Sequence, residues 1–223
     1  MSFIETFLNW EVLTRSLPLL MMGLKVTVQL GAVSIVAGLL LGLGIALLRL
    51  YGFAPLRVIA KIYIDIFRSI PLLVLLIVVY YALPFVGMRL SPFLSAALTL
   101  TVVSGAYTAE IFRAGIEAIP RGQFEASQAL GLRFRHMMQD VILPQALRVV
   151  VPPLTNNSIN VVKDTALASV VAMPDLLKQA TQAQALEANP TPLIAAAVLY
   201  IAMLWPLVAL VSRLERKYRA ERS

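Results

Sequence analysis

The sequence predicts an all-α integral membrane protein with five transmembrane helices, and two observations lead to this fold class. The first is composition: of 223 residues, 59% are hydrophobic and 14% are charged, with no cysteine, whereas soluble domains are about 45–50% apolar and about 25% charged. A water-soluble fold of this size has too little interior for so many apolar side chains. The second is a series of apolar stretches about 20 residues long, the length that a helix needs to cross a bilayer. A cytosolic enzyme and a nucleic-acid-binding protein are therefore poor interpretations, and no nucleic-acid partner is expected.

Each expected span begins near a proline or ends at a charged residue. Pro18 and Arg49 enclose the first stretch, and prolines open the second, third and fifth. The fourth stretch is the most polar. The five expected spans cover residues 19–48, 71–86, 92–112, 149–173 and 192–211, and a longer interpretation starts the second near Ile62. Nothing in this pattern divides the chain, so residues 1–223 are interpreted as one transmembrane domain.

The basic residues between the spans predict the orientation. The segments 49–61, 113–148 and 213–222 hold three, five and five Lys or Arg residues. The segments on the opposite side hold only Arg15, Arg89 and Lys178. Because cytoplasmic segments of membrane proteins collect Lys and Arg, we expect the N-terminus outside and the C-terminus in the cytoplasm.

The segment between the third and fourth spans, about 113–148, is long for a connection and has helical periodicity. Apolar side chains such as Phe124 and Leu132 alternate with polar ones, Gly131 interrupts the pattern, and Pro144 ends a second apolar run. We expect two short helices joined at Gly131, on the cytoplasmic side of the membrane. The alternative is a surface helix that rests on lipid headgroups.

Four separated motifs resemble those of the membrane-spanning permease subunits of ABC importers. The segment from Glu125-Ala126-Ser127 through Gly131 to Val141-Ile142-Leu143-Pro144 resembles their EAA loop, with Ser127 for the usual second alanine and Val141 for the usual isoleucine. The second-span motif is FRSIPLL at 67–73, and two further motifs resemble the polar amino-acid permeases: AYTAEIFRAGIE with IPRGQ at 106–123, and KDTAL at 163–167. The resemblance covers nearly the whole chain.

This resemblance implies the type I ABC importer permease fold, with short cytoplasmic coupling helices, and a translocation pathway for polar amino acids such as glutamate, aspartate, glutamine, histidine or arginine. It also implies that the loop contacts a separate ATPase subunit through Glu125, Ala126, Ser127, Gly131, Leu143 and Pro144. The chain has no G-x-x-x-x-G-K-[ST] phosphate loop, so we do not expect it to be an enzyme. ATP and Mg²⁺ are expected on the partner ATPase. No cofactor is expected on this chain. The other implied partners are a second permease subunit, identical or different, an extracytoplasmic substrate-binding protein and membrane lipid. The implied location is the bacterial inner membrane.

The fourth span carries an unusual group of polar residues. Asn156, Asn160, Lys163 and Asp164 share roughly one helical face, with Thr165 directly after them. Polar and ionisable groups at membrane depth usually face a protein interior or a wet cavity. One hypothesis is that they line the substrate pathway, and the other is that they hold helices or a gate together through hydrogen bonds.

Three other residues, Arg68, Glu110 and His136, carry separate hypotheses. Arg68, before the second span, is expected either to reach the headgroups or to help bind an anionic carboxylate. Glu110 is expected either to pair with Arg113, three residues later on the same helix, or to meet a cation in the pathway. The single histidine, His136, cannot form a metal site alone, so neither a metal site nor a catalytic residue is expected.

Two other classes of function compete with an importer subunit. An ATP-independent channel or ion-coupled carrier is the main alternative, but such carriers are expected to have internal repeats with broken helices in both halves, and no convincing repeat is visible here. A membrane scaffold without transport activity gains little from a polar fourth span.

Overall fold

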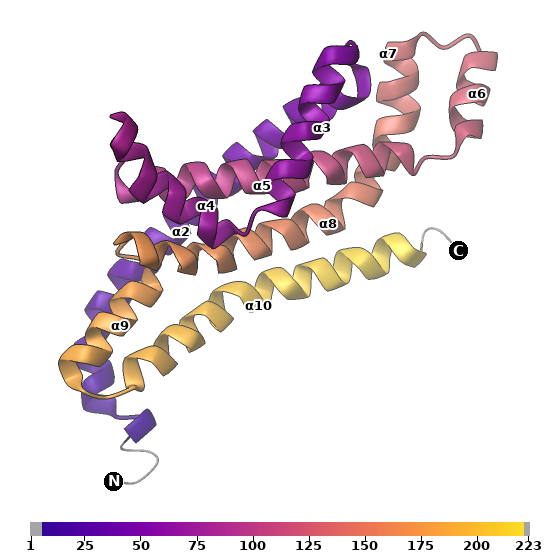
Figure 1. Cartoon of the computed structure of the whole chain (residues 1–223). Coiled ribbons are helices and arrows are strands. Elements are labelled where there is room, and N and C mark those ends of the chain that lie inside the picture. Colours follow the sequence, from indigo (N-terminus) through magenta and orange to yellow (C-terminus); the bar gives the residue numbers. More distant parts are fainter. Residues whose placement is uncertain (1–5, 221–223) are drawn as a thin grey trace.

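The computed structural model describes residues 6–220, and within that part of the chain every regular element is a helix. Figure 1 shows long helices that run side by side, with α6 and α7 projecting at the end where the C-terminus lies and α9 at the opposite end. In chain order the elements are α2 (Trp10–Tyr51), α3 (Ala54–Ser69), α4 (Leu72–Ile77), the π-helix η1 (Val78–Ala82), the 3₁₀-helix η2 (Leu83–Val86), α5 (Pro92–Glu117), α6 (Arg121–Ala129), α7 (Phe134–His136), the π-helix η3 (Met137–Ile142), α8 (Leu143–Asp164), the 3₁₀-helix η4 (Thr165–Val171), α9 (Leu176–Glu187) and α10 (Thr191–Ala220).

Three of the five expected spans are confirmed as helices long and apolar enough to cross a membrane. They are α2, α5 and the part of α10 from Thr191 to Arg213. α3 and the segment Leu72–Val86 together meet the same test but are bent by 100°, so the expected second span is a broken one. The break falls at Ile70 and Pro71 because proline disfavours the helical conformation of the residue before it.

The fourth expected span, 149–173, does not meet this test, so a count of five is not confirmed. The chain there is helical, as α8 followed by η4. α8 contains two prolines and the polar group from Asn156 to Asp164, and these residues lower its hydropathy. The described part of the chain therefore has three apolar spans, or four with the bent pair.

Small residues at the interface let α2 and α5 approach closely. A Cβ atom added at Gly38 would lie 2.8 Å from Ser104 Oγ, and one at Gly42 would lie 2.5 Å from Thr108 Cβ. The Gly38-x₃-Gly42 pattern thus provides the close helix packing that such spacing predicts in membranes. Serine and threonine are buried along the same interface, whereas bulky apolar residues of α2 and α10 such as Leu40 and Trp205 are exposed, as expected for helices that face lipid.

Candidate functional site

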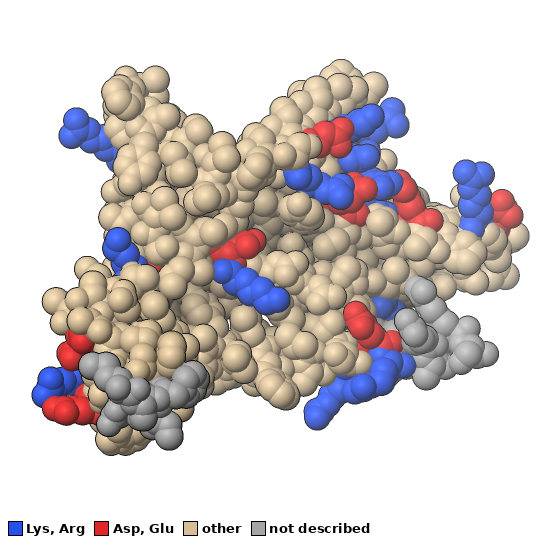
Figure 2. All heavy atoms as spheres, turned by 60° about the horizontal axis from the view of Figure 1, so that its bottom comes forward, with Lys and Arg blue, Asp and Glu red and all other residues tan. Residues whose placement is uncertain are grey.

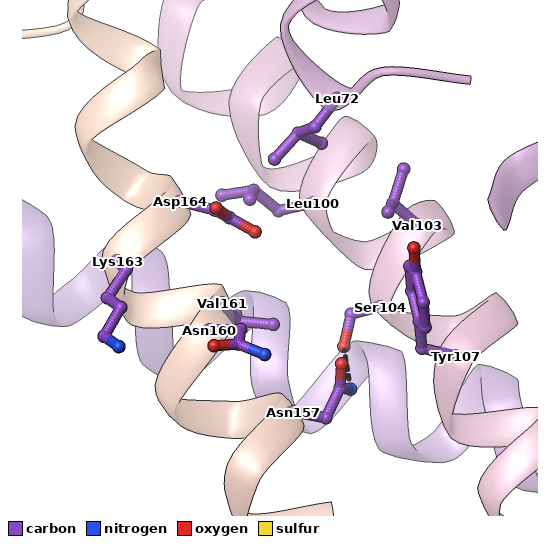
Figure 3. Close-up of a pocket in the computed structure, with 10 residues that line it drawn as sticks. All are labelled: Leu72, Leu100, Val103, Ser104, Tyr107, Asn157, Asn160, Val161, Lys163 and Asp164. Carbon is purple, nitrogen blue, oxygen red and sulfur yellow. Dashed lines mark hydrogen bonds between the residues drawn. The ribbon is translucent and has the colours of Figure 1, made fainter. Parts of the chain in front are cut away.

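A cavity of about 350 Å³ lies between α4, α5 and α8. Figure 3 shows polar side chains of both α8 and α5, among them Asn160 and Asp164, reaching inward. The residues that line it are Leu72 of α4, Leu100, Val103, Ser104 and Tyr107 of α5, and Asn157, Asn160, Val161, Lys163 and Asp164 of α8.

Helical spacing explains which residues of α8 reach the cavity. Asn157, Asn160, Val161 and Asp164 follow one another at i, i+3, i+4 and i+7, so they occupy one stripe of the helix. Of the four residues expected on one face of this helix, Asn160, Lys163 and Asp164 line the cavity. Asn156 is exposed on a neighbouring face and is not among the lining residues.

Asn157 was missed as a candidate, although it is the polar residue that links two elements of the site. Its Nδ2 donates hydrogen bonds to Ser104 Oγ at 3.1 Å and to Thr108 Oγ1 at 3.2 Å. These acceptors lie on α5 where Gly38 and Gly42 of α2 pack. Asn157 therefore holds α8 against α5 by the kind of interhelical hydrogen bond that stabilises membrane helices. The same i, i+3, i+7 spacing that relates it to Asn160 and Asp164 could have identified it.

The remaining polar residues at the end of α8 point in different directions. Figure 3 shows the Asp164 carboxylate turned into the cavity and the Lys163 ammonium extending away from it. This agrees with the expectation that adjacent residues of a helix do not face each other. Thr165 is fully buried and donates its hydroxyl hydrogen bond to the carbonyl of Val162 at 2.6 Å, so its side chain is occupied within its own turn.

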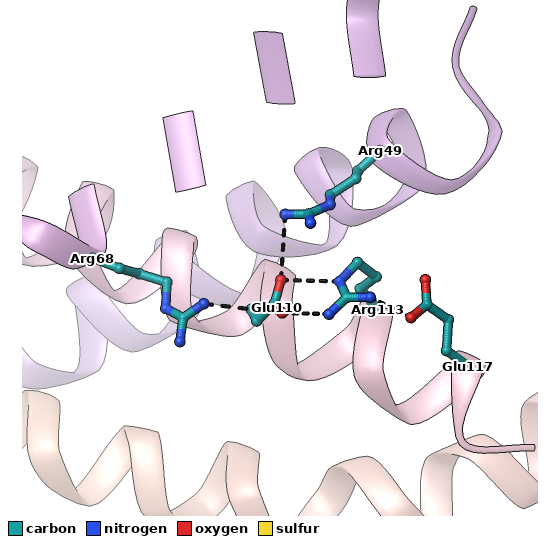
Figure 4. Close-up of polar contacts among 5 residues, drawn as sticks. All are labelled: Arg49, Arg68, Glu110, Arg113 and Glu117. Carbon is teal, nitrogen blue, oxygen red and sulfur yellow. Dashed lines mark hydrogen bonds and ion pairs between the residues drawn. The ribbon is translucent and has the colours of Figure 1, made fainter. Parts of the chain in front are cut away.

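A cluster of charges lies one helical turn beyond the cavity along α5, around Glu110 (Figure 4). Arg113 makes two hydrogen bonds to Glu110, at 3.0 and 2.5 Å, which confirms the expected local pair. Arg113 also contacts Glu117. From other helices, Arg49 Nη1 approaches Glu110 Oε2 to 3.4 Å and Arg68 Nη1 approaches Glu110 Oε1 to 4.0 Å. Glu110 thus joins the ends of α2, α3 and α5.

Arg68 also connects this cluster to the cavity. Its guanidinium carbon lies 5.4 Å from the centre of the Tyr107 ring, within the range of a cation–π contact. Tyr107 in turn lines the cavity. Arg68 therefore sits at the boundary between the cavity and the charge cluster.

The loop between α5 and α8 begins with a short helix and a glycine turn, as expected. α6 ends where the N–H of Leu132 donates to the carbonyl of Ser127 and the N–H of Gly131 donates to that of Gln128. Gly131 has φ +74°, the left-handed conformation that this helix ending requires and that glycine adopts without strain. The glycine is needed for the backbone rather than for space, since an added Cβ would meet nothing within 4 Å.

The second half of the loop differs from the expectation. α7 continues through η3 directly into α8, and Pro144 lies in the first turn of α8 instead of ending a separate helix. Proline removes one hydrogen bond from a continuing helix, and the π-helical turn η3 directly before Pro144 is where the hydrogen bonds depart from the α-helical pattern. The second short helix is therefore the start of α8, so α7, η3 and α8 form one continuous helical arm.

Most of the six candidate coupling residues lie on the surface of this loop. Glu125, Ala126, Gly131, Leu143 and Pro144 are exposed. Ser127 is only 3% exposed and donates a hydrogen bond to the carbonyl of Gln123 at 2.7 Å. Its small size serves the packing of the loop against its own core, so its side chain is not available to a partner.

Within residues 6–220 no group of three or more His, Cys, Asp or Glu side chains could hold a metal ion. The geometry instead defines a class of protein: a multi-pass helical membrane protein with a polar cavity between its helices and an exposed helical loop. The family described as "Binding-protein-dependent transport system inner membrane component" matches residues 3–220. The chain belongs to this family.

The relatives place the chain more narrowly. It is 35% identical over 215 residues to the "Arginine transport system permease protein ArtQ" of Bacillus subtilis (strain 168), covering 96% of this chain and 98% of that one. It is 38% identical over 178 residues to the "L-cystine transport system permease protein TcyB" of the same organism, covering 79% and 76%. A solved chain of an "amino acid ABC transporter with histidines" superposes with a TM-score of 0.86 at 36% identity, covering 92% and 96%. The protein is therefore a permease subunit of the amino-acid ABC transporter class, as its motifs predicted.

Proposed function

We propose that this chain forms the translocation pathway for a polar amino acid in an ATP-driven importer of a bacterial inner membrane. The observation that carries the proposal is the polar cavity between α5 and α8, because polar groups at membrane depth are costly unless they serve a pathway or a contact. In this proposal α8 and η4 complete a fifth crossing, with the N-terminus outside and the C-terminus in the cytoplasm. The polarity of α8 is then a consequence of facing the pathway.

The chemistry of the cavity suits a zwitterion. An amino acid carries one anionic and one cationic end, and a site must offer partners to both to offset their desolvation. Asp164 offers an acceptor for an ammonium group, while the amide of Asn160 and the hydroxyl of Tyr107 offer donors for a carboxylate. A volume of about 350 Å³ lies within the range of about 300–1,000 Å³ for small-molecule sites.

The proposed partners follow from the coupling loop. An ATPase subunit would contact the exposed surface of α6 and the start of α8, where Glu125, Ala126, Leu143 and Pro144 lie. Short helices transmit a displacement better than a flexible strand of chain, and α7, η3 and α8 connect this surface to the cavity without a break. A second permease subunit and an extracytoplasmic binding protein would complete the importer.

Reconstitution tests this function directly. The chain is purified with its co-expressed partners, placed in ATP-loaded proteoliposomes with the binding protein outside, and screened with single amino acids for uptake and for stimulated ATP hydrolysis. We expect one amino acid or a small group to stimulate both. Uptake that proceeds equally without ATP would support the channel or carrier alternative instead.

A substitution at Asp164 distinguishes substrate contact from a gate in the same preparation. If Asp164 binds the ammonium group, Asp164→Asn raises the substrate concentration for half-maximal uptake. If Asp164 instead closes the pathway against the second subunit, the change raises ATP hydrolysis without substrate and leaves the half-maximal concentration nearly unchanged. Lys163→Met is the matched comparison at the neighbouring position. Wild-type values of both quantities in both variants would exclude either role.

A further inference from the structure

We propose that Arg68 is a binding site for the carboxylate of the amino acid as it leaves the cavity toward the coupling loop. The inference rests on the proposed function and adds a residue and a chemical group to it. In the resting arrangement Arg68 pairs with Glu110, and the substrate carboxylate takes the place of Glu110 as it passes.

Arg68, a residue of α3, lies beside the face of α5 that leads out of the cavity, and this position supports an exit role. The face of α5 that lines the cavity runs through Leu100, Val103, Ser104 and Tyr107, and the same spacing continues to Glu110. A molecule that moves from the cavity along this face toward the coupling loop next meets the Arg68 guanidinium, which lies over the Tyr107 ring. Figure 4 shows Arg68 and Arg113 on opposite sides of Glu110, so Arg68 is the arginine on the cavity side.

Arg68 is also the most weakly held of the three arginines around Glu110. Its nearest approach to the carboxylate is 4.0 Å, compared with 3.4 Å for Arg49 and 2.5 Å for Arg113. Its side chain is 40% exposed, whereas those of Arg49 and Arg113 are about half as exposed, at 21% and 22%. An arginine in this state can exchange one carboxylate for another without breaking a short hydrogen bond.

The other two arginines of the cluster keep Glu110 paired during the exchange, so its free-energy cost is small. When Arg68 turns to a substrate carboxylate, Glu110 keeps its two hydrogen bonds to Arg113 and its contact with Arg49. The Glu110 carboxylate therefore stays paired. Leaving one charge of a pair without a partner is what usually makes breaking an ion pair unfavourable. Arginine is suited to the task because its planar guanidinium can bind a carboxylate through two parallel hydrogen bonds.

The test measures product binding from the side of the coupling loop. Proteoliposomes are loaded with ATP and with rising concentrations of the unlabelled amino acid that the reconstitution identifies, and the uptake of labelled amino acid is followed. The second probe is the α-carboxamide of the same amino acid, which lacks only the carboxylate. In the wild type we expect the luminal amino acid to inhibit uptake more strongly than its carboxamide.

Two substitutions should shift this inhibition in opposite directions. Arg68→Gln should raise the inhibition constant of the amino acid by about tenfold, the loss of one charge-assisted hydrogen-bonded contact, and leave that of the carboxamide unchanged. Glu110→Gln removes the competing carboxylate and should lower the inhibition constant of the amino acid severalfold. Arg57→Gln is the matched control, since Arg57 is an exposed arginine of the same helix α3.

The outcomes separate a binding role from a structural one. A residue that only held α3 against α5 would change the maximal rate, or the inhibition by both probes equally, and that result would overturn the proposal. So would a wild-type transporter that luminal amino acid does not inhibit, or an Arg68→Gln inhibition constant equal to the wild-type value. If Arg68→Gln fails to assemble, Arg68→Lys takes its place and should also raise the inhibition constant of the amino acid, while Glu110→Gln should still lower it. Absence of any amino-acid uptake by the wild type would instead overturn the proposed function.

Discussion

Two glycines of α2 that lie two positions apart, Gly42 and Gly44, differ completely in what surrounds them. A Cβ at Gly42 would lie 2.5 Å from Thr108 Cβ and 2.8 Å from the carbonyl oxygen of Gly105, whereas a Cβ at Gly44 would meet nothing within 4 Å. Gly42→Ala therefore forces α2 and α5 apart and should destabilise the protein by about 1–3 kcal/mol, the usual cost of overpacking. Gly44→Ala should be neutral or stabilising by up to about 1 kcal/mol, because alanine favours the helix. Thermal unfolding in detergent measures both, and equal midpoints would contradict the packing of these helices.

Asp175 gives a pH-dependent prediction at the same scale. It caps α9, accepting a hydrogen bond from the N–H of Lys178 at 3.1 Å, and it is fully buried. Because burial disfavours the charged carboxylate, the pKa of Asp175 rises from 3.8 to about 6. The folded state thus binds the proton more tightly than the unfolded state, which contributes stability below pH 3.8 that is lost as the pH rises to about 6. The contribution is at most about 3 kcal/mol for a shift of this size.

Asp175→Asn tests this linkage because asparagine keeps the cap and cannot ionise. The unfolding midpoint of the wild type should fall between about pH 4 and pH 6, the interval bounded by the two pKa values of Asp175, whereas that of Asp175→Asn should change less over the same interval. Parallel curves for the two proteins would show that the carboxyl group is not the source.

The polar residues of the site could be predicted from the sequence, but only part of their arrangement could. The group on α8 is visible because Asn, Lys and Asp are unusual in an apolar stretch, and three of the four residues assigned to one face do line the cavity. Asn157 lines the cavity and Asn156 does not; Asn157 shares its i, i+3, i+7 spacing with Asn160 and Asp164, a relation that the expected face with Asn156 overlooked. The ion pairs of Glu110 with Arg49 and Arg68 join residues far apart in the chain, so local spacing could not reveal them.

At the scale of the elements, the turn after α6 controls how the coupling loop presents its surface. Gly131 has φ +74° with open space around its Cβ position, so substitutions there should act through the backbone. Gly131→Asn should be tolerated because asparagine adopts this conformation readily, whereas Gly131→Val should strain the turn by about 1–2 kcal/mol or more. We expect Gly131→Val to reduce amino-acid uptake per ATP hydrolysed, or to prevent assembly with the ATPase, while the helices still insert.

The measurement is the ratio of uptake to ATP hydrolysis in proteoliposomes, with membrane insertion checked by extraction. Gly122→Val provides the control, since Gly122 also has open space around its Cβ position but its φ is not in the left-handed range. Full coupling by Gly131→Val at normal expression would remove the turn from the coupling mechanism.

Elements with a strong local signal were predicted well, and those shaped by neighbours were not. Length and apolarity identified α2, α5 and α10, whereas Pro71 was expected to open the second span or to lie within it, and the break between α3 and α4 was not predicted. The 100° bend itself depends on how α3 packs against α2 and α5, which no residue near the break encodes. The continuity of α7, η3 and α8 was not predicted because a proline usually ends or kinks a helix, whereas here a π-helical turn precedes Pro144 and the helix continues.

For the whole molecule, the charges are distributed as the basic-residue count suggests. Figure 2 shows Lys, Arg, Asp and Glu gathered mainly toward the ends of the molecule, with a broad uncharged belt between them that is interrupted at a central hollow. Arg121, Arg133 and Arg135 of the coupling loop are exposed at one end. This loop and the C-terminal end of α10 lie at the same end of the molecule (Figure 1), so both should lie on one side of the membrane.

Reporter fusions test this orientation. Truncations fused after Leu130 in the coupling loop and after the C-terminal end of α10 should activate a fluorescent reporter that matures only in the cytoplasm. A fusion after Gly87, in the exposed turn between η2 and α5, should instead activate a phosphatase that works only outside. The physical reason is that positively charged segments are retained in the cytoplasm during insertion, so moving basic residues should move the topology: adding several lysines near Gly87 should weaken the outside signal there. The reverse pattern of the three fusions would overturn the predicted orientation, and matching signals at Leu130 and Gly87 would show that α5 does not cross the membrane.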